Sequence, residues 1–210
     1  MNRTAKRPPS SRERGSVSAL GVAMTLLLFL MLALAVDIGI AFATSIHQNS
    51  MMQIAREESQ STANGFLVKS SADPLAELSS QCIRSIRAQG FDGKIEVDAW
   101  EAGAGFSMGG KTLPSNKRII AYEIRLDGSS PAIFARMAGV DSVPVSAAGD
   151  WNLTLYSNSA SWRPQTASAG ATFTCEAGKD AAATTRKAAT LASMGGGVKS
   201  KAEEAFAALP

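Results

Sequence analysis

The stretch GSVSALGVAMTLLLFLMLALAVDIGIAFATSI, residues 15–46, decides the fold of this chain. The 22 residues from Gly15 to Val36 carry no charge. A helix needs about 20 apolar residues, each rising ~1.5 Å, to cross the hydrocarbon core of a bilayer. Because this run is apolar on every side, it differs from the one-sided apolar stripe of a soluble helix. We therefore predict a transmembrane helix over residues 15–43.

Charges on the two sides of this helix predict its orientation. The tail, residues 1–14, holds five basic residues and one acid, whereas the next basic residue after the helix is Arg56. Positive flanks stay in the cytoplasm. We expect a cytoplasmic tail, a single pass through the cell membrane with lipid as a partner, and an extracytoplasmic domain from about Thr44. The tail accounts for the net charge of +3, so the charge does not indicate a nucleic-acid partner.

The remaining pattern predicts an α+β domain on a long helix. Residues 44–70 lack proline and continue the helical spacing as a stalk, and residues 71–178 form the domain. Asp73-Pro74 begins a helix that ends at Gly90. Alternating apolar residues predict the strands of a small antiparallel sheet, with helices packed on one face, at 94–102, 118–126 and 143–155, and a short edge strand at 172–175.

The rest of the chain contains shorter predicted elements. Pro131 and Gly139 bound a short helix, and the glycine-rich residues 103–116 read as a loop. Residues 179–210 are rich in alanine, and three consecutive glycines at 195–197 interrupt them. We expect helix before these glycines and a last amphipathic helix after them, as a mobile tail or a partner-docking segment.

Three residues, Asp37 and the two cysteines, have open roles. Asp37 lies near the end of the membrane helix, where it either contacts a partner helix or sits at the headgroup level. Cys82 and Cys175 both fall outside the membrane, where disulfides persist. They are a candidate disulfide, and two unpaired thiols are the alternative, because spacing alone does not show proximity.

Two stretches resemble a known family. The first is RGSV at 14–17 with the apolar run and LAVDIG at 34–39; the second is AIFARMAG at 132–139, followed by SVPVSAA at 142–148. Together they are similar to TadE/TadG-like proteins, which are pilin-like components of the tight-adherence (Flp) pilus machinery. The resemblance implies a pilin-like architecture, and it implies other pilin-like or pilus-assembly membrane proteins as partners.

Processing of the N-terminus has two candidate sites. A prepilin-type peptidase cuts after a glycine that precedes the apolar helix, and Gly15-Ser16 fits that position. Prepilins carry a glutamate five residues after this glycine, where this chain has Leu20, so the cleavage stays open. A signal peptidase would instead cut after Ala41-Phe42-Ala43. The apolar run is longer than a usual signal sequence, and Asp37 interrupts it, which speaks against that cut.

The chemistry needed for catalysis is sparse in this sequence. His47 is the single histidine, and there is no metal-ligand spacing, no phosphate-binding loop and no close functional pair of carboxylates on a predicted element. We expect no enzyme activity, no cofactor, no metal and no small-molecule substrate. The leading hypothesis is a pilin-like accessory component of a Tad/Flp-type pilus or a related secretion apparatus. The alternative is a signal-anchored extracytoplasmic binding or interaction domain that is unrelated to pili.

Overall fold

The computed structural model describes residues 11–156 and 168–210, with side chains described from residue 19 onward. Residues 1–10 of the predicted tail lie outside the described residues. The chain divides into two units by its contacts. The helical unit contains the chain up to Phe42 together with Pro131–Val143, and the sheet unit contains Ala43–Ser130 and Pro144–Pro210.

Helix α1, Ser11–Ser59, begins in the helical unit and ends in the sheet unit. Among the described residues it is the one helix long and apolar enough to cross a membrane, by length and composition. Every side chain from Leu26 to Leu32 is at least 48% exposed, so no face of this stretch is covered by protein. The helix is thus consistent with a single-pass membrane anchor near the N-terminus.

The predicted stalk is not one continuous helix. α1 ends at Ser59, and a separate helix α2, Thr62–Ser70, follows. Ser61 between them is extended, and its side chain accepts a hydrogen bond from Asn64 N. The Asn64 amide donates back to the carbonyl of Glu58 at 2.7 Å. These side chains compete with the helical backbone bonds and end α1 one turn after Ala55.

Helix α3, Pro74–Ala88, confirms the prediction for this region. Asp73 caps it by accepting from Ala76 N at 3.1 Å, and Gly90 turns the chain at a φ of 86°. A left-handed φ favours glycine because a Cβ would clash there. Strand β1 then follows directly.

Five strands form the main sheet in the order β5-β4-β1-β6-β7. β1 is antiparallel to both β4 and β6, and β6 is antiparallel to β7. A two-stranded ribbon of β2 and β3 occupies part of the predicted 103–116 loop. The bounds are β1 Lys94–Ala102, β2 Ser107–Met108, β3 Lys111–Thr112, β4 Lys117–Pro131, β5 Ser142–Tyr156, β6 Ser168–Cys175 and β7 Thr185–Ala188.

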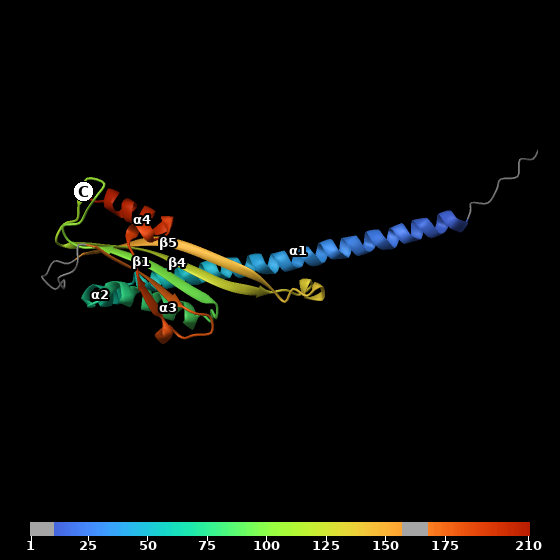
Figure 1. Ribbon diagram of the computed structural model, residues 1–210, viewed down its shortest axis with the longest axis horizontal. Helices are drawn as coiled ribbons and strands as arrows, with labels where there is room; N and C mark the ends of the chain where they lie inside the picture. The colour runs from blue at the N-terminus through green and yellow to red at the C-terminus, as the bar shows by residue number, and fades with distance from the viewer. Residues whose placement is uncertain (1–10, 157–167) are drawn as a thin grey trace, which may run out of the picture. The chain divides into compact units, whose positions relative to one another are not determined.

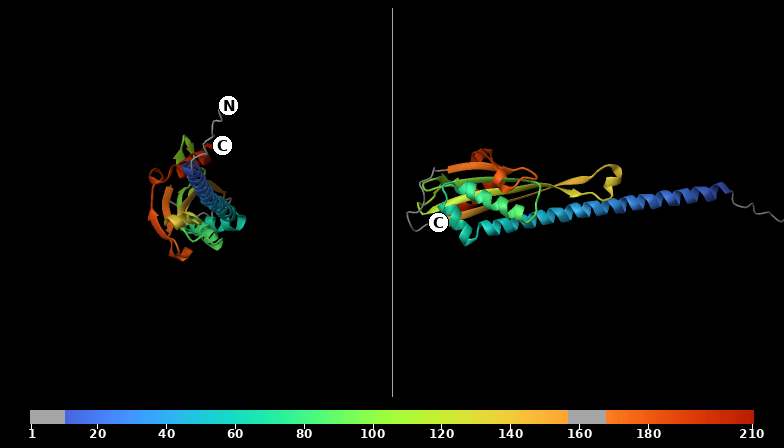
Figure 2. Two further views of the ribbon diagram at one scale, coloured as in Figure 1. Left: turned by 90° about the vertical axis from the view of Figure 1, so that its right-hand side faces the viewer. Right: turned by 90° about the horizontal axis from the view of Figure 1, so that it is seen from below.

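Helices cover both faces of this sheet, whereas one covered face was predicted (Figures 1 and 2). Val97 and Ile124 lie on the face that packs with α3 and the end of α1. Trp100 and Ile119 lie on the opposite face with helix α4, Gly196–Ala207. We call these the α3 face and the α4 face. Alternation along each strand separates the two cores, since successive side chains point to opposite faces.

The last helix of the chain is confirmed, whereas the residues before it differ from their prediction. The stretch expected to be helical holds two short 3-10 turns, η2 at Ala181–Ala183 and η3 at Leu191–Ser193, and strand β7 between them. β6 is therefore an interior strand, because β7 pairs on its outer side. α4 begins within the glycines that were expected to interrupt the helix, and Phe206 is buried on the sheet. Pairing and packing override the alanine-rich composition here.

Candidate functional site

The carboxylate of Asp37 is held by three successive backbone N–H groups of the helical unit. Asp37 is only 4% exposed on α1. Its Oδ1 accepts from Ile133 N at 2.9 Å, and its Oδ2 accepts from Ala135 N at 2.6 Å. Phe134 N donates to both oxygens at 3.2 Å. We call this arrangement the Asp37 clamp.

The clamp has a simple physical origin. The three N–H groups stand at the start of the 3-10 helix η1, Ala135–Ala138, where a helix has donors without intrahelical partners. A carboxylate satisfies several such donors at once with charge-assisted bonds. Gly139 then ends η1 at a φ of 84°, where glycine is the favoured residue. The predicted helix at 131–139 is thus a shorter 3-10 turn after the last residue of β4.

Neither role expected for Asp37 includes this contact. The sequence offered a partner helix or the headgroup level, and the structure places the carboxylate against the backbone of the same chain. The two stretches that carry the family resemblance, 34–39 and 132–139, are the ones that the clamp joins. Sequence reasoning missed the contact because 98 positions separate Asp37 from Ala135.

Around the clamp, the connection between β4 and β5 presents an apolar surface. We call residues 132–141 the apolar tip. Met137 is 90% exposed, and three further apolar side chains of the tip are 42–56% exposed: Ile133, Phe134 and Val140. A cavity of about 550 Å³ lies between the tip and α1, and every residue lining it is apolar: Leu26, Phe29, Leu30, Leu32, Ala33, Phe134, Met137 and Ala138.

The charges of the tip form one pair. Arg136 Nε lies 3.2 Å from Asp141 Oδ1, and both side chains are more than 70% exposed. Asp141 also accepts the N–H of Ala132 at its carbonyl oxygen, 3.1 Å away. The tip therefore closes on itself at its base, through Ala132 and Asp141.

Comparison with protein families, with curated proteins and with solved structures finds no match for this chain.

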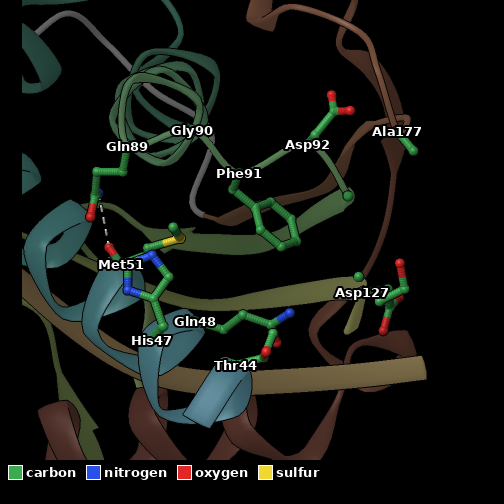
Figure 3. Close-up of a pocket in the computed structure, with 13 residues that line it drawn as sticks. Thr44, His47, Gln48, Met51, Gln89, Gly90, Phe91, Asp92, Asp127 and Ala177 are labelled. Carbon is green, nitrogen blue, oxygen red and sulfur yellow. Dashed lines mark hydrogen bonds between the residues drawn. The ribbon is translucent and has the colours of Figure 1, made fainter. Parts of the chain in front are cut away.

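A second cavity, of about 670 Å³, lies in the sheet unit (Figure 3). The last turns of α1 supply Thr44, His47 and Gln48, and the turn between α3 and β1 supplies Gln89–Gly93. Gln48 is 2% exposed, and its Oε1 has no hydrogen-bond partner among the described residues. The cavity therefore contains a buried acceptor that a polar guest would satisfy.

Two glycines shape the wall of this cavity. The ring of Phe91 lies over Gly93 and Gly128, where added Cβ atoms would come within 2.6 and 3.1 Å of it. The Gln89 amide donates to the carbonyl of Met51 at 3.3 Å and ties the turn to α1, as the dashed line in Figure 3 shows. His47 lines the same space, and the described residues hold no group of three His, Cys, Asp or Glu side chains suited to a metal.

The two cysteines are free thiols in the structure, in place of the candidate disulfide. Both are buried, and their surroundings differ. Cys175 Sγ accepts from Arg87 Nη2 at 3.3 Å and faces the carbonyl oxygens of Lys179 and Asp180. Burial raises the pKa of Cys82 to about 12, although the Ser59 hydroxyl beside it acts in the opposite direction.

A cluster of four charged side chains is built around Arg125 on the α4 face of the sheet unit. Its guanidinium contacts Glu96 and Asp98 at 2.5 Å and Glu123 at 2.8 Å. The hydrogen bond with Glu123 raises the pKa of Arg125 above its usual range. Thr172 donates its hydroxyl to Asp98 at 2.5 Å. Because these side chains bind one another across three strands, the cluster reads as a structural link of the sheet.

The candidate cleavage site lies at the edge of what the structure describes. Gly15 and Ser16 fall within the backbone of α1, and their side chains lie outside the described residues. The alternative cut after Ala43 would fall within the same helix, before Met51 and Met52, which are buried on the sheet.

Proposed function

We propose that this chain is a single-pass membrane component of a pilin-like assembly, of the Tad/Flp pilus type or a related secretion apparatus. The observation that carries the proposal is the double role of α1. Its N-terminal part is apolar and exposed, whereas Met52 and Ala55 near its end are 1% and 0% exposed in the core of the sheet unit. A helix of this kind both anchors the domain and forms part of it.

The Asp37 clamp supports the same proposal. It joins the two stretches whose sequences resemble TadE/TadG-like proteins, residues 34–39 and 132–139. Their contact gives a physical reason for both patterns to occur in one chain. In this proposal the basic tail lies in the cytoplasm and the sheet unit lies outside, in agreement with the positive flank before α1.

A second function is favoured by one observation, the cavity of about 670 Å³ with the buried acceptor of Gln48. Small ligands bind in concave sites where polar groups converge, and Thr44, His47 and Gln48 of α1 supply such groups here. This observation favours the alternative of a signal-anchored binding domain, which would need the helix only as an anchor.

One genetic experiment separates the two functions. In the producing cell, residues 16–36 are replaced by an unrelated apolar span of equal length, which preserves anchoring and leaves Asp37 in place. A pilus component acts through this helix, so we expect surface pili and adherence to be lost as fully as in a deletion. Normal pili in both the deletion and the replacement strain would contradict the proposal. The function as a signal-anchored binding domain would then be favoured.

The intact mass of the membrane-extracted chain adds an independent test. Removal of residues 1–15 would show prepilin-type processing at Gly15 despite Leu20, and Gly15→Val would then abolish it. An intact N-terminus would assign α1 to static anchoring. A cut after Ala43 would remove the anchor and contradict the proposal.

A further inference from the structure

We infer that the apolar tip, residues 132–141, inserts into the hydrocarbon of the membrane beside α1 as a second, re-entrant contact with lipid. The inference rests on the proposed anchoring of α1. It adds a second segment of the chain that contacts the same bilayer. The tip and the first part of α1 belong to the same unit, and both views show them side by side (Figures 1 and 2).

The position of the tip along α1 sets its depth. Asp37 binds the start of η1, and the cavity beneath Met137 extends along α1 to Leu26. These two α1 residues are separated by about 16 Å along the helix axis. If Gly15–Val36 fills the hydrocarbon core, Asp37 lies at its outer boundary, and Met137 reaches well inside it.

Backbone polar groups are the main obstacle to placing a non-helical segment in lipid. In the tip, hydrogen bonds within the helical unit satisfy most of the backbone N–H groups. Seven of the nine N–H groups from residue 132 to residue 140 donate hydrogen bonds within the unit: three bind the Asp37 carboxylate, and four bind carbonyl oxygens of Asp141, Phe134, Arg136 and Ala135. The clamp thus supplies what lipid lacks, an acceptor for donors at the start of η1.

The one exposed cation of the tip also suits a membrane boundary. Arg136 pairs with Asp141, and the neighbouring Met137 makes no part of this pair and is 90% exposed. A long arginine stem passes through an apolar layer while its guanidinium stays at the polar level. The pair therefore marks the headgroup region, with the apolar side chains below it.

Lipid fits the surface better than a partner helix. Transmembrane helices approach one another closely over small residues such as glycine, alanine and serine. Six of the eight residues that line the cavity are leucine, phenylalanine or methionine, two are alanine, and none is polar. Acyl chains adapt to an irregular apolar groove, whereas a helix would leave much of this cavity empty.

The experiment uses the full chain in vesicles of phosphatidylcholine and phosphatidylglycerol with a phospholipid that carries a diazirine midway along one acyl chain. After irradiation and trypsin, adducts are mapped by mass spectrometry. We expect labelling in Gly15–Arg56 from α1, in Leu126–Arg136 and at Met137–Val140. Ile95–Lys111 of the sheet unit should stay unlabelled.

The outcomes separate this inference from the proposed function. If α1 is labelled and the tip is not, the inference is overturned, whereas the proposed anchoring by α1 is still supported. An unlabelled α1 contradicts the anchor itself. Met137→Glu should abolish most tip labelling and keep that of α1, whereas Phe66→Glu, at a 64% exposed apolar residue of α2, should change neither. Unchanged tip labelling in Met137→Glu would also overturn the inference.

A second readout tests the competing occupant. A benzophenone amino acid in place of Met137 reacts with whatever touches that position. A lipid adduct supports the inference. A covalent product of twice the chain mass would show that a second copy covers the tip, and it would overturn the inference.

Discussion

Asp37 Oδ2 accepts the N–H of Ala135 at 2.6 Å across 98 positions of sequence. This bond and its neighbours join α1 to the connection between β4 and β5. A single carboxylate therefore links the helix that is consistent with an anchor to the turn that carries Met137, a methionine that is 90% exposed.

Asp37→Asn should loosen the apolar tip. The amide keeps one acceptor oxygen but loses the charge and the second acceptor, and an unmet buried donor costs about 1–3 kcal/mol. Amide exchange at Ile133–Ala135, measured by mass spectrometry in detergent, should rise about tenfold for each 1.4 kcal/mol lost. The matched control is Asp141→Asn, because the Asp141 side chain is 80% exposed. Equal protection in Asp37→Asn and the unmodified chain would show that the clamp contributes little.

Arg125→Gln should destabilise the sheet unit strongly. The change leaves three carboxylates without their shared cation, and removing one partner of a largely buried pair costs about 3 kcal/mol. Arg84→Gln is the control, since Arg84 is 61% exposed and lies 3.7 Å from Glu77. Exposed pairs of this kind contribute at most about 1 kcal/mol. Denaturant unfolding followed by circular dichroism measures both, and similar losses would refute the central role of Arg125.

Alanine substitutions at two neighbouring glycines should change the stability of the sheet unit in opposite directions. A Cβ at Gly197 would lie 2.9 Å from Glu123 Oε2 and 3.0 Å from Asp150 Cβ, so Gly197→Ala should cost about 1–3 kcal/mol through overpacking. A Cβ at Gly196 meets nothing within 4 Å, and Gly196→Ala should stabilise by about 0.4–1 kcal/mol through a less flexible unfolded chain. Thermal unfolding distinguishes them. A gain in both variants would mean that α4 does not pack as described.

Stability should fall as the pH rises above about 9. Burial raises the pKa of Cys82 to about 12 from an ordinary value of 9.0, so the unfolded chain loses this proton first. The unfolded state then binds fewer protons than the folded state, and the free energy of unfolding drops by up to about 1.4 kcal/mol per pH unit. Burial also raises the pKa of Tyr122, in the same direction. Cys82→Ala should give a shallower slope between pH 9 and 12, and an unchanged slope would contradict this assignment.

The thiols should be counted in the absence of reductant. Because both cysteines are free and buried, iodoacetamide should add no group to the native chain and two groups after unfolding. Intact mass measures the additions. A chain that needs reductant before it takes up any alkyl group would instead contain the Cys82–Cys175 disulfide.

Local patterns predicted the elements that depend on local chemistry. The alternation at 94–102 coincides with β1, and the Asp73-Pro74 start of α3 is confirmed. β4 extends to Pro131, five residues beyond its prediction, because the polar residues after Leu126 show no alternation. β7 was missed since Thr185–Ala188 has a helical composition and becomes a strand only by pairing with β6.

The candidate site was predictable only in its parts. Asp37 stood out as a charge in an apolar run, and residues 132–139 stood out as an apolar segment between Pro131 and Gly139. Their contact joins positions 98 residues apart, which no periodicity in one sequence reports. The cavity near Gln48 was likewise not predictable, because α1, a turn and β4, which are distant in sequence, form its walls.

The burial of Met52 and Ala55 has a consequence for the order of synthesis. These residues leave the ribosome early, and the strands that cover them, β1, β4 and β6, are made later. Contacts between distant positions form slowly because the chain must first close long loops. During translation the end of α1 therefore stays uncovered until β6, the last strand of its core cluster, has been made, and exposed apolar surface of this kind makes an incomplete chain prone to aggregation.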